Sequence, residues 1–350
     1  MNKEFYTKKI NNDGTYSITI NDGVTEIPDS AFRGCSSLTS INIPNSVISI
    51  GDGAFCGCYD LTSIEIPNSV IRIGDYVFAY CYSLTSINIP NSITSIGDWV
   101  FEGCRDLISI SIPNSVTSIG EYAFSGCTSL SSINIPDSVT SIGSSIFDNC
   151  SNLTSIEIPN TFFSTLSNPI FINCTNLHYI NDIDITEHIT SDMIPNNITT
   201  LGPIFACTRI TGIDIPSNIT SIGNDAFCNC TKLSSINISN SVNSIGESAF
   251  YNCKNLKSIK IPDNITKINK YTFFYCTSLS SIEIPDSVTS IGDSAFYECS
   301  SLTSINIPDG VTNIGIGAFA YCPNLKSISL PNGIKIDDNA FDKCVKINYK

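Results

Sequence analysis

Hydrophobic positions along the chain recur with a fixed period of 23 residues. Within one period, a segment such as LTSIEIP (61–67) alternates apolar and polar residues, which predicts a short strand. The proline ends the strand, and the Asn-Ser or Asp-Ser pair after it is typical of a turn. A second segment, such as SIGDGAF (49–55), carries a glycine and an aspartate before a small apolar pair. We expect this segment to form a short α-helical or 3-10 turn.

Cysteine marks the same period. Of the 16 cysteines, all but Cys56 and Cys228 form a ladder in which most steps are 23 residues long. The ladder consists of Cys35, Cys58, Cys81, Cys104, Cys127, Cys150, Cys174, Cys207, Cys230, Cys253, Cys276, Cys299, Cys322 and Cys344. A period of this length predicts a solenoid, because one coil cannot bury its apolar face without its neighbours. We predict a single β-dominated α/β solenoid over residues 1–350, with about fourteen coils. Each coil is expected to have one short parallel strand and a helical turn opposite it.

The repeated pattern L-x-S-I-x-I-P, followed by S-V-T-S-I-G-x-x-A-F-x-x-C, resembles the BspA-like leucine-rich repeats over about residues 16–349. The resemblance implies a leucine-rich-repeat solenoid that binds proteins without catalysis. It also implies adhesion at a cell surface, with a host or matrix protein as the ligand. The ligand itself is not identified by the repeat, because function in solenoids depends on the exposed positions.

Both ends depart from the repeat. Residues 1–22 are expected to form an N-terminal half-coil cap, because the segment YSITI (16–20) aligns with the strand of the next coil. Residues 345–350 are expected to form a terminal half-strand. No strongly polar unit follows that strand, so the open end could pair with a second copy of the chain.

The interior of the chain also contains one irregular long repeat, at residues 160–205. Cys174 and Cys207 are 33 residues apart, ten more than the period, and both histidines, His178 and His188, lie between them. This segment is either a tolerated surface loop or a binding element. The spacing of the two histidines does not favour a metal site.

Composition narrows the range of functions. The net charge is −14, with 18 basic and 32 acidic residues, which disfavours binding to nucleic acid or to anionic lipid surfaces. No apolar run is long enough to span a membrane, and we expect no membrane insertion. The sequence has neither a phosphate-binding glycine motif nor a set of nucleophile, base and orienting acid. We therefore expect no enzymatic activity, no cofactor and no metal.

Two repeated positions have a structural interpretation. Acidic residues precede the expected helical turns, and we interpret them as N-caps of their own turns, with calcium bridging as a weaker alternative. These residues are Asp29, Asp52, Asp75, Asp98 and Glu121. The ladder cysteines lie between a buried Phe and a buried Leu, so we expect them to be buried free thiols rather than disulfides.

Outward positions of the strands give one candidate binding surface, on the concave face of the solenoid. Side chains alternate across a strand, so the residues between the buried isoleucines point outward. The candidates here are Asn42, Glu65, Asn88, Asn134 and Glu157. The alternative is a solvated ladder of strand residues that hydrogen-bond with one another.

Two aromatic stripes give another candidate surface. Tyr76, Trp99 and Tyr122 share one repeat position in successive coils. A second position, just after the buried Phe, is shared by three further aromatic residues. They are Tyr251, Phe274 and Tyr297. Exposed aromatic patches often bind partners, although stacked aromatic rings can also simply stiffen the coil.

The sequence thus predicts a non-catalytic solenoid that binds a protein ligand. A cell-surface adhesion protein is the first hypothesis. An intracellular interaction scaffold in the cytoplasm is the alternative, favoured by the thiol-rich interior and by the N-terminal sequence, which does not resemble a secretory signal.

Overall fold

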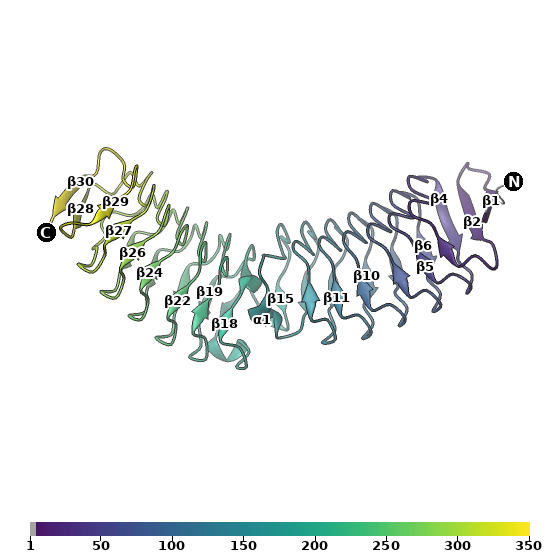
Figure 1. Cartoon of the computed structure of the whole chain (residues 1–350), viewed down its shortest axis with the longest axis horizontal. Helices are drawn as coiled ribbons and strands as arrows, with labels where there is room; N and C mark the ends of the chain where they lie inside the picture. The colour runs from purple at the N-terminus through teal and green to yellow at the C-terminus, as the bar shows by residue number, and fades with distance from the viewer. Residues whose placement is uncertain (1–4) are drawn as a thin grey trace. The chain divides into compact units, whose positions relative to one another are not determined.

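The computed structural model describes residues 5–350 of the chain (Figure 1). These residues belong to two compact units. Unit 1 comprises Met1–Pro159, from residue 5 on, together with Ile170–Asp182, and unit 2 comprises Asn160–Pro169 and Ile183–Lys350. The boundary falls inside the irregular repeat at residues 160–205. One domain over residues 1–350 stays a prediction, and each unit is described by itself.

Both units are β-solenoids built from parallel strands, as the sequence predicts (Figure 1). Ser63 pairs with Ser86 and Ile64 with Ile87, so equal repeat positions lie side by side. Strand isoleucines are buried, and the residues on either side of them are mostly exposed. In unit 1 these strands are β2 (Tyr16–Ile20), β4 (Leu38–Asn42), β6 (Ser63–Glu65), β8 (Ser86–Asn88), β10 (Ser109–Ser111), β12 (Ser132–Asn134), β14 (Ser155–Glu157) and β15 (Tyr179–Ile180). In unit 2 they are β17 (His188–Ile189), β19 (Gly212–Asp214), β21 (Ser235–Asn237), β23 (Ser258–Lys260), β25 (Ser281–Glu283), β28 (Ser327–Leu330) and β30 (Lys346–Tyr349).

A second, narrower parallel sheet runs along each unit, and the expectation of one strand per coil was wrong. Two-residue strands form at the Ser-Ile pair that precedes the glycine of each repeat, such as Ser49–Ile50, which pairs with Arg72–Ile73. In unit 1 they are β3 (Glu26–Ile27), β5 (Ser49–Ile50), β7 (Arg72–Ile73), β9 (Ser95–Ile96), β11 (Ser118–Ile119) and β13 (Ser141–Ile142). In unit 2 they are β18 (Thr200–Leu201), β20 (Ser221–Ile222), β22 (Ser244–Ile245), β24 (Lys267–Ile268), β26 (Ser290–Ile291), β27 (Asn313–Ile314) and β29 (Lys335–Ile336).

The segments expected to be helical turns are arcs of non-helical turns. Alternate N–H groups donate to the following coil, as Phe32 does to Ala54 (2.8 Å) and Gly34 to Cys56 (2.7 Å). The N–H groups between them close turns within their own coil, so no continuous helix forms. Residues with left-handed backbone angles keep these groups directed along the solenoid axis. Within residues 5–350, helix occurs only in the irregular repeat. It forms α1 (Phe162–Thr165), η1 (Ser191–Met193) and η2 (Pro203–Phe205), all in unit 2.

The ends of the chain pair as extra strands. Residues 1–4 of the predicted cap lie outside the described residues, and Tyr16–Ile20 forms β2, which pairs parallel with β4. An unpredicted strand, β1 (Tyr6–Ile10), covers the outer edge of β2 in antiparallel register. At the other end, β30 pairs parallel with β28. The side chain of Lys350 then reaches back to the Ile307 carbonyl and to Asp309, each at 2.8 Å.

Apolar side chains at equal repeat positions fill the core. The phenylalanines of unit 1 from Phe32 to Phe147 stack with ring centroids 5.5–5.8 Å apart. Most ladder thiols are buried as predicted, and none forms a disulfide within residues 5–350. Each donates to the carbonyl of the phenylalanine in the preceding coil, as Cys58 does to Phe32 at 3.2 Å. Three ladder cysteines are exceptions: Cys35 and Cys207 are half-buried, and Cys344 is exposed.

Cys207 is not a rung of the ladder, and that assignment was wrong. Its N–H donates to the carbonyl of Cys228 (2.7 Å), which places it one position before the rung. Thr208 occupies the rung instead, and both its hydroxyl (2.5 Å) and the Cys230 thiol (2.9 Å) donate to the Phe205 carbonyl. The long interval between Cys174 and Cys207 hid this shift of one residue.

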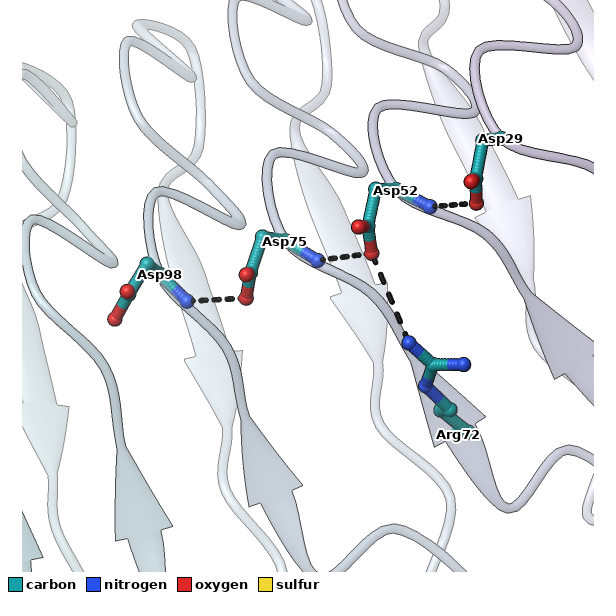
Figure 2. A network of polar contacts seen from close by, with 5 residues as sticks. All are labelled: Asp29, Asp52, Arg72, Asp75 and Asp98. Carbon is teal, nitrogen blue, oxygen red and sulfur yellow. Dashed lines mark hydrogen bonds and ion pairs between the residues drawn. The ribbon is translucent and has the colours of Figure 1, made fainter.

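Acidic residues connect successive coils, and their interpretation as N-caps of their own turns was wrong. The carboxylates of the four aspartates each accept the N–H of the equivalent residue in the following coil, and Figure 2 shows the first three of these bonds. The oxygen of Asp75 lies 2.9 Å from the nitrogen of Asp98. The preceding glycine makes room for this bond, because a Cβ on Gly97 would lie 2.2 Å from the same oxygen. We call this arrangement the Gly-Asp contact.

The burial of the ladder thiols predicts their reactivity. Burial raises the pKa of Cys58 and of Cys276 to about 12, so almost no thiolate forms at pH 8. We expect iodoacetamide to modify Cys344 in the folded protein and to leave both of these thiols unmodified. All of them should react in denaturant. Peptide mass spectrometry measures this, and rapid native modification of Cys58 would contradict the buried ladder.

The Gly-Asp contact predicts a pair of matched substitutions. Gly97→Ala should destabilise the protein by about 1–3 kcal/mol, because its Cβ collides with the Asp75 carboxylate. In an Asp75→Ala background the same change should be neutral or stabilising, because the next atom near the new Cβ is the Gly74 carbonyl oxygen, at 3.5 Å. Urea unfolding midpoints followed by circular dichroism measure both effects.

Gly120→Ala with Asp98→Ala is the control for that pair. A Cβ on Gly120 also meets the backbone nitrogen of Asp98 at 2.6 Å, which no side-chain truncation removes. Rescue in this second pair, or its failure in the first, would contradict the assigned contact.

Candidate functional site

The strand face of unit 1 carries all five predicted outward residues, and all five are exposed. Asn42, Glu65 and Asn88 line a shallow hollow of about 550 Å³, together with the Pro-Asn turns beside the strands. Asn134 and Glu157 line a second hollow of about 440 Å³. Their placement on one face is therefore observed, while their binding role stays a prediction.

Polar groups in these hollows are available to a ligand. The side-chain amides of Asn42, Asn88 and Asn134 make no hydrogen bond with any residue between 5 and 350. Each amide offers both donors and an acceptor. Burial, reinforced by the neighbouring charge of Asp182, raises the pKa of Glu157 above its usual range. The strand face thus suits hydrogen bonding to a polar partner such as a polypeptide backbone.

The first aromatic stripe is a stack of parallel rings. Tyr76 and Trp99 have centroids 4.8 Å apart, and Trp99 and Tyr122 have centroids 5.5 Å apart. Trp99 and Tyr122 are half-buried by this stacking, whereas Tyr76 is 40% exposed. The ring faces are mostly covered by one another, so the stack offers ring edges and the outer face of Tyr76 to a partner.

All three of these residues have left-handed backbone angles, with φ of 58° at Tyr76 and 53° at Trp99 and Tyr122. At the same repeat position most other coils carry serine, such as Ser30, or glycine, and the exceptions include Asp225 and Tyr271. A bulky residue in this conformation costs about 1–2 kcal/mol, which stacking offsets in part. Strain of this kind is often retained at functional positions.

The sequence analysis missed several members of this surface. Tyr59 and Tyr82 stack at 4.8 Å, and the guanidinium of Arg105 lies 4.4 Å from the ring centroid of Tyr82. Their common position just after the ladder cysteine was the signal that could have found them. Tyr80 packs edge-on against Tyr82 and is hydrogen-bonded to Glu102. Burial is the largest cause that raises the pKa of Tyr80, and this hydrogen bond is the second; together they raise it to about 12.

Unit 2 contains the second stripe, also as a stack. Tyr251 and Phe274 have centroids 5.0 Å apart, and Phe274 and Tyr297 have centroids 4.6 Å apart. Tyr321, which sequence analysis missed because it lies one repeat position later, extends the stack at 4.9 Å. Tyr275 packs edge-on against Phe274 at 4.7 Å.

The two histidines of the irregular repeat lie in different units, His178 in unit 1 and His188 in unit 2. His188 lies beside Asp214, with Nε2 and Oδ1 3.2 Å apart. Among residues 5–350, no three His, Cys, Asp or Glu side chains are grouped so that they could hold a metal ion. Likewise, no helix in the described part of the chain is long and apolar enough to cross a membrane.

Comparison with known proteins identifies the repeat. The family model of the BspA type leucine rich repeat region, which describes six copies of the repeat, matches the chain over residues 2–116, 94–200, 184–256, 202–315 and 243–349. The chain belongs to this family. Its solenoids are generally non-catalytic. No curated protein is similar enough to this chain to match it.

Solved bacterial structures have the same fold. A leucine-rich repeat protein from Bacteroides ovatus is 28% identical, with a TM-score of 0.63 and coverage of 100% of this chain and 99% of that one. A leucine rich cell surface protein from Faecalibacterium prausnitzii is 29% identical over 94% of each chain, with a TM-score of 0.57. A Eubacterium ventriosum leucine-rich repeat protein, at 24% identity and a TM-score of 0.62, covers 99% of this chain and 94% of its own and shows the fold alone.

The raised pKa of Tyr80 predicts a pH dependence. Its folded pKa of about 12 exceeds the unfolded value of about 10, so its contribution to stability is complete below pH 10. That contribution is lost as the pH rises through 12. Glu102→Gln should lower the pKa of Tyr80 toward 10, because a neutral acceptor replaces a charged one. Tyrosine ¹³C NMR titration measures this.

Glu121→Gln is the matched control, since Glu121 is not among the groups that shift Tyr80. An unchanged Tyr80 titration in Glu102→Gln, or an equal shift in the control, would contradict the assigned hydrogen bond.

Proposed function

We propose that this chain is a non-catalytic cell-surface protein that binds a host or matrix protein. The strand face of unit 1 is the main support for this proposal, because its hollows are lined by side-chain amides that have no hydrogen-bond partner within the described residues. A partner polypeptide can satisfy several of these amides at once, since they repeat from strand to strand. The similarity to the Faecalibacterium prausnitzii cell surface protein supports the location.

The aromatic stacks are proposed as a second binding surface. For the first stack, the left-handed backbone at Tyr76, Trp99 and Tyr122 is the observation that favours this role, because most other coils carry serine or glycine there. Half-buried tyrosine and tryptophan side chains also supply the anchors that dominate protein interfaces.

A cytoplasmic interaction scaffold is the second candidate function. It is favoured by the 16 cysteines, which form no disulfide within residues 5–350, since thiols persist in reducing compartments. End-to-end association of chains stays a prediction in either case. Lys8 and Lys9 on β1 oppose it, because lysines on an edge strand disfavour pairing with another strand.

The binding proposal is tested with immobilised matrix proteins and intact host cells. Replacing Asn42, Asn88 and Asn134 by arginine should weaken binding at least about tenfold, because the charged side chains fill the hollows. The control variant places arginine at Thr94, Thr117 and Thr140, which are exposed away from the strand face. Trp99→Ser tests the aromatic stack separately.

Equal binding by the asparagine variant and the wild type would exclude the strand face. Surface labelling of intact cells with an impermeant biotin reagent tests the location. Recovery of unlabelled protein in the cytosol would support the scaffold instead.

A further inference from the structure

The irregular repeat changes one row of outward side chains in unit 2. On most strands the first outward residue is serine, as at Ser235 and Ser258. On β17 it is His188, and on β19 it is Gly212. The register pairs His188 with Gly212 and Gly212 with Ser235. The histidine and the serine therefore lie on either side of a position that has no side chain.

Both neighbouring side chains lean over this glycine. A Cβ on Gly212 would lie 2.3 Å from Nδ1 of His188 and 2.7 Å from Oγ of Ser235, so these two atoms are at most about 5 Å apart. Side chains standing upright two strands apart would be separated by about 9.6 Å. The imidazole and the hydroxyl therefore face each other across the space over Gly212. A change of the Ser235 rotamer moves Oγ within this space.

Asp214 fixes the orientation of the imidazole. It lies two residues after Gly212 on β19, and its Oδ1 is 3.2 Å from Nε2 of His188. The neutral imidazole donates Nε2–H to this carboxylate, which leaves the lone pair on Nδ1 directed at the serine side. His188 is 46% exposed and Ser235 is exposed, so small molecules reach both groups.

We propose that Ser235 is a nucleophile that accepts one acyl group per chain from an activated carboxylic ester, a stoichiometric self-modification without turnover. His188 acts as the general base, and Asp214 is a positioning residue. Oγ of Ser235 attacks the ester carbonyl while its proton passes to Nδ1 of His188. The carbonyl carbon–oxygen bond of the leaving group then breaks, and the departing alkoxide takes that proton. The products are an O-acyl serine and the free alcohol.

The row supplies its own internal control. Ser258 and Ser281 occupy the same position on β23 and β25, without a histidine beside them. With p-nitrophenyl acetate as the probe, we expect Ser235 to be acetylated at least about tenfold faster than either serine. Peptide mass spectrometry of the intact chain after short exposures gives the rate at each residue.

Three variants test the assigned roles. His188→Ala should reduce acetylation of Ser235 to the level of Ser258, and added imidazole should restore part of it. Gly212→Ala should also reduce it, because the new Cβ lies between the two groups. Asp214→Asn should slow the reaction and change the imidazole tautomer, which ¹⁵N NMR of His188 detects. Circular dichroism confirms that each variant is folded.

Equal acetylation of Ser235 and Ser258 in the wild type would overturn the proposal. An unchanged acetylation rate of Ser235 in His188→Ala would also overturn it. Because His188 is exposed, this variant is expected to fold even if Gly212→Ala does not.

Discussion

Main-chain hydrogen bonds between successive coils are the interaction on which the rest of the structure depends. They run through the strands and also through the arcs, where N–H groups such as that of Phe32 donate to the following coil. These bonds hold equal repeat positions at the spacing of neighbouring strands. Each side chain therefore meets a copy of itself, and only residues that tolerate such a neighbour can occupy a repeated position.

Aromatic, thiol and carboxylate groups meet this requirement in different ways. Phenylalanine rings stack, and thiols avoid one another by donating to the carbonyl of a phenylalanine. Carboxylates one coil apart would repel each other. A backbone N–H of the following coil offsets this repulsion by donating to one carboxylate oxygen, as the N–H of Asp98 does to Oδ1 of Asp75. The glycine before Asp52, Asp75 and Asp98 is needed because a Cβ there would occupy the same space as the carboxylate oxygen of the preceding coil.

Surface chemistry varies while the backbone stays constant. Positions that are outward on the strands can change without affecting the core, so unit 1 presents amides and carboxylates. Unit 2 presents His188, Gly212 and Ser235 at the place where the repeat is irregular. Positions in the arcs are less free, because their left-handed backbone favours small residues, and the aromatic residues at Tyr76, Trp99 and Tyr122 depart from that preference.

The sequence by itself determined the solenoid, the strand positions and the buried rows, because a 23-residue period assigns each residue an environment that recurs in every coil. It also placed the candidate residues Asn42 and Glu65 on one face, since alternation along a strand is a local property. It failed where the partner is a residue of another coil. The second strand at Ser49–Ile50, the acceptor role of Asp75 and the displacement of Cys207 by Thr208 all depend on contacts between coils. Only the tertiary structure decided these features, because the sequence of a single repeat does not specify its register with the next coil. The same holds for His188 and Ser235, which face each other over Gly212.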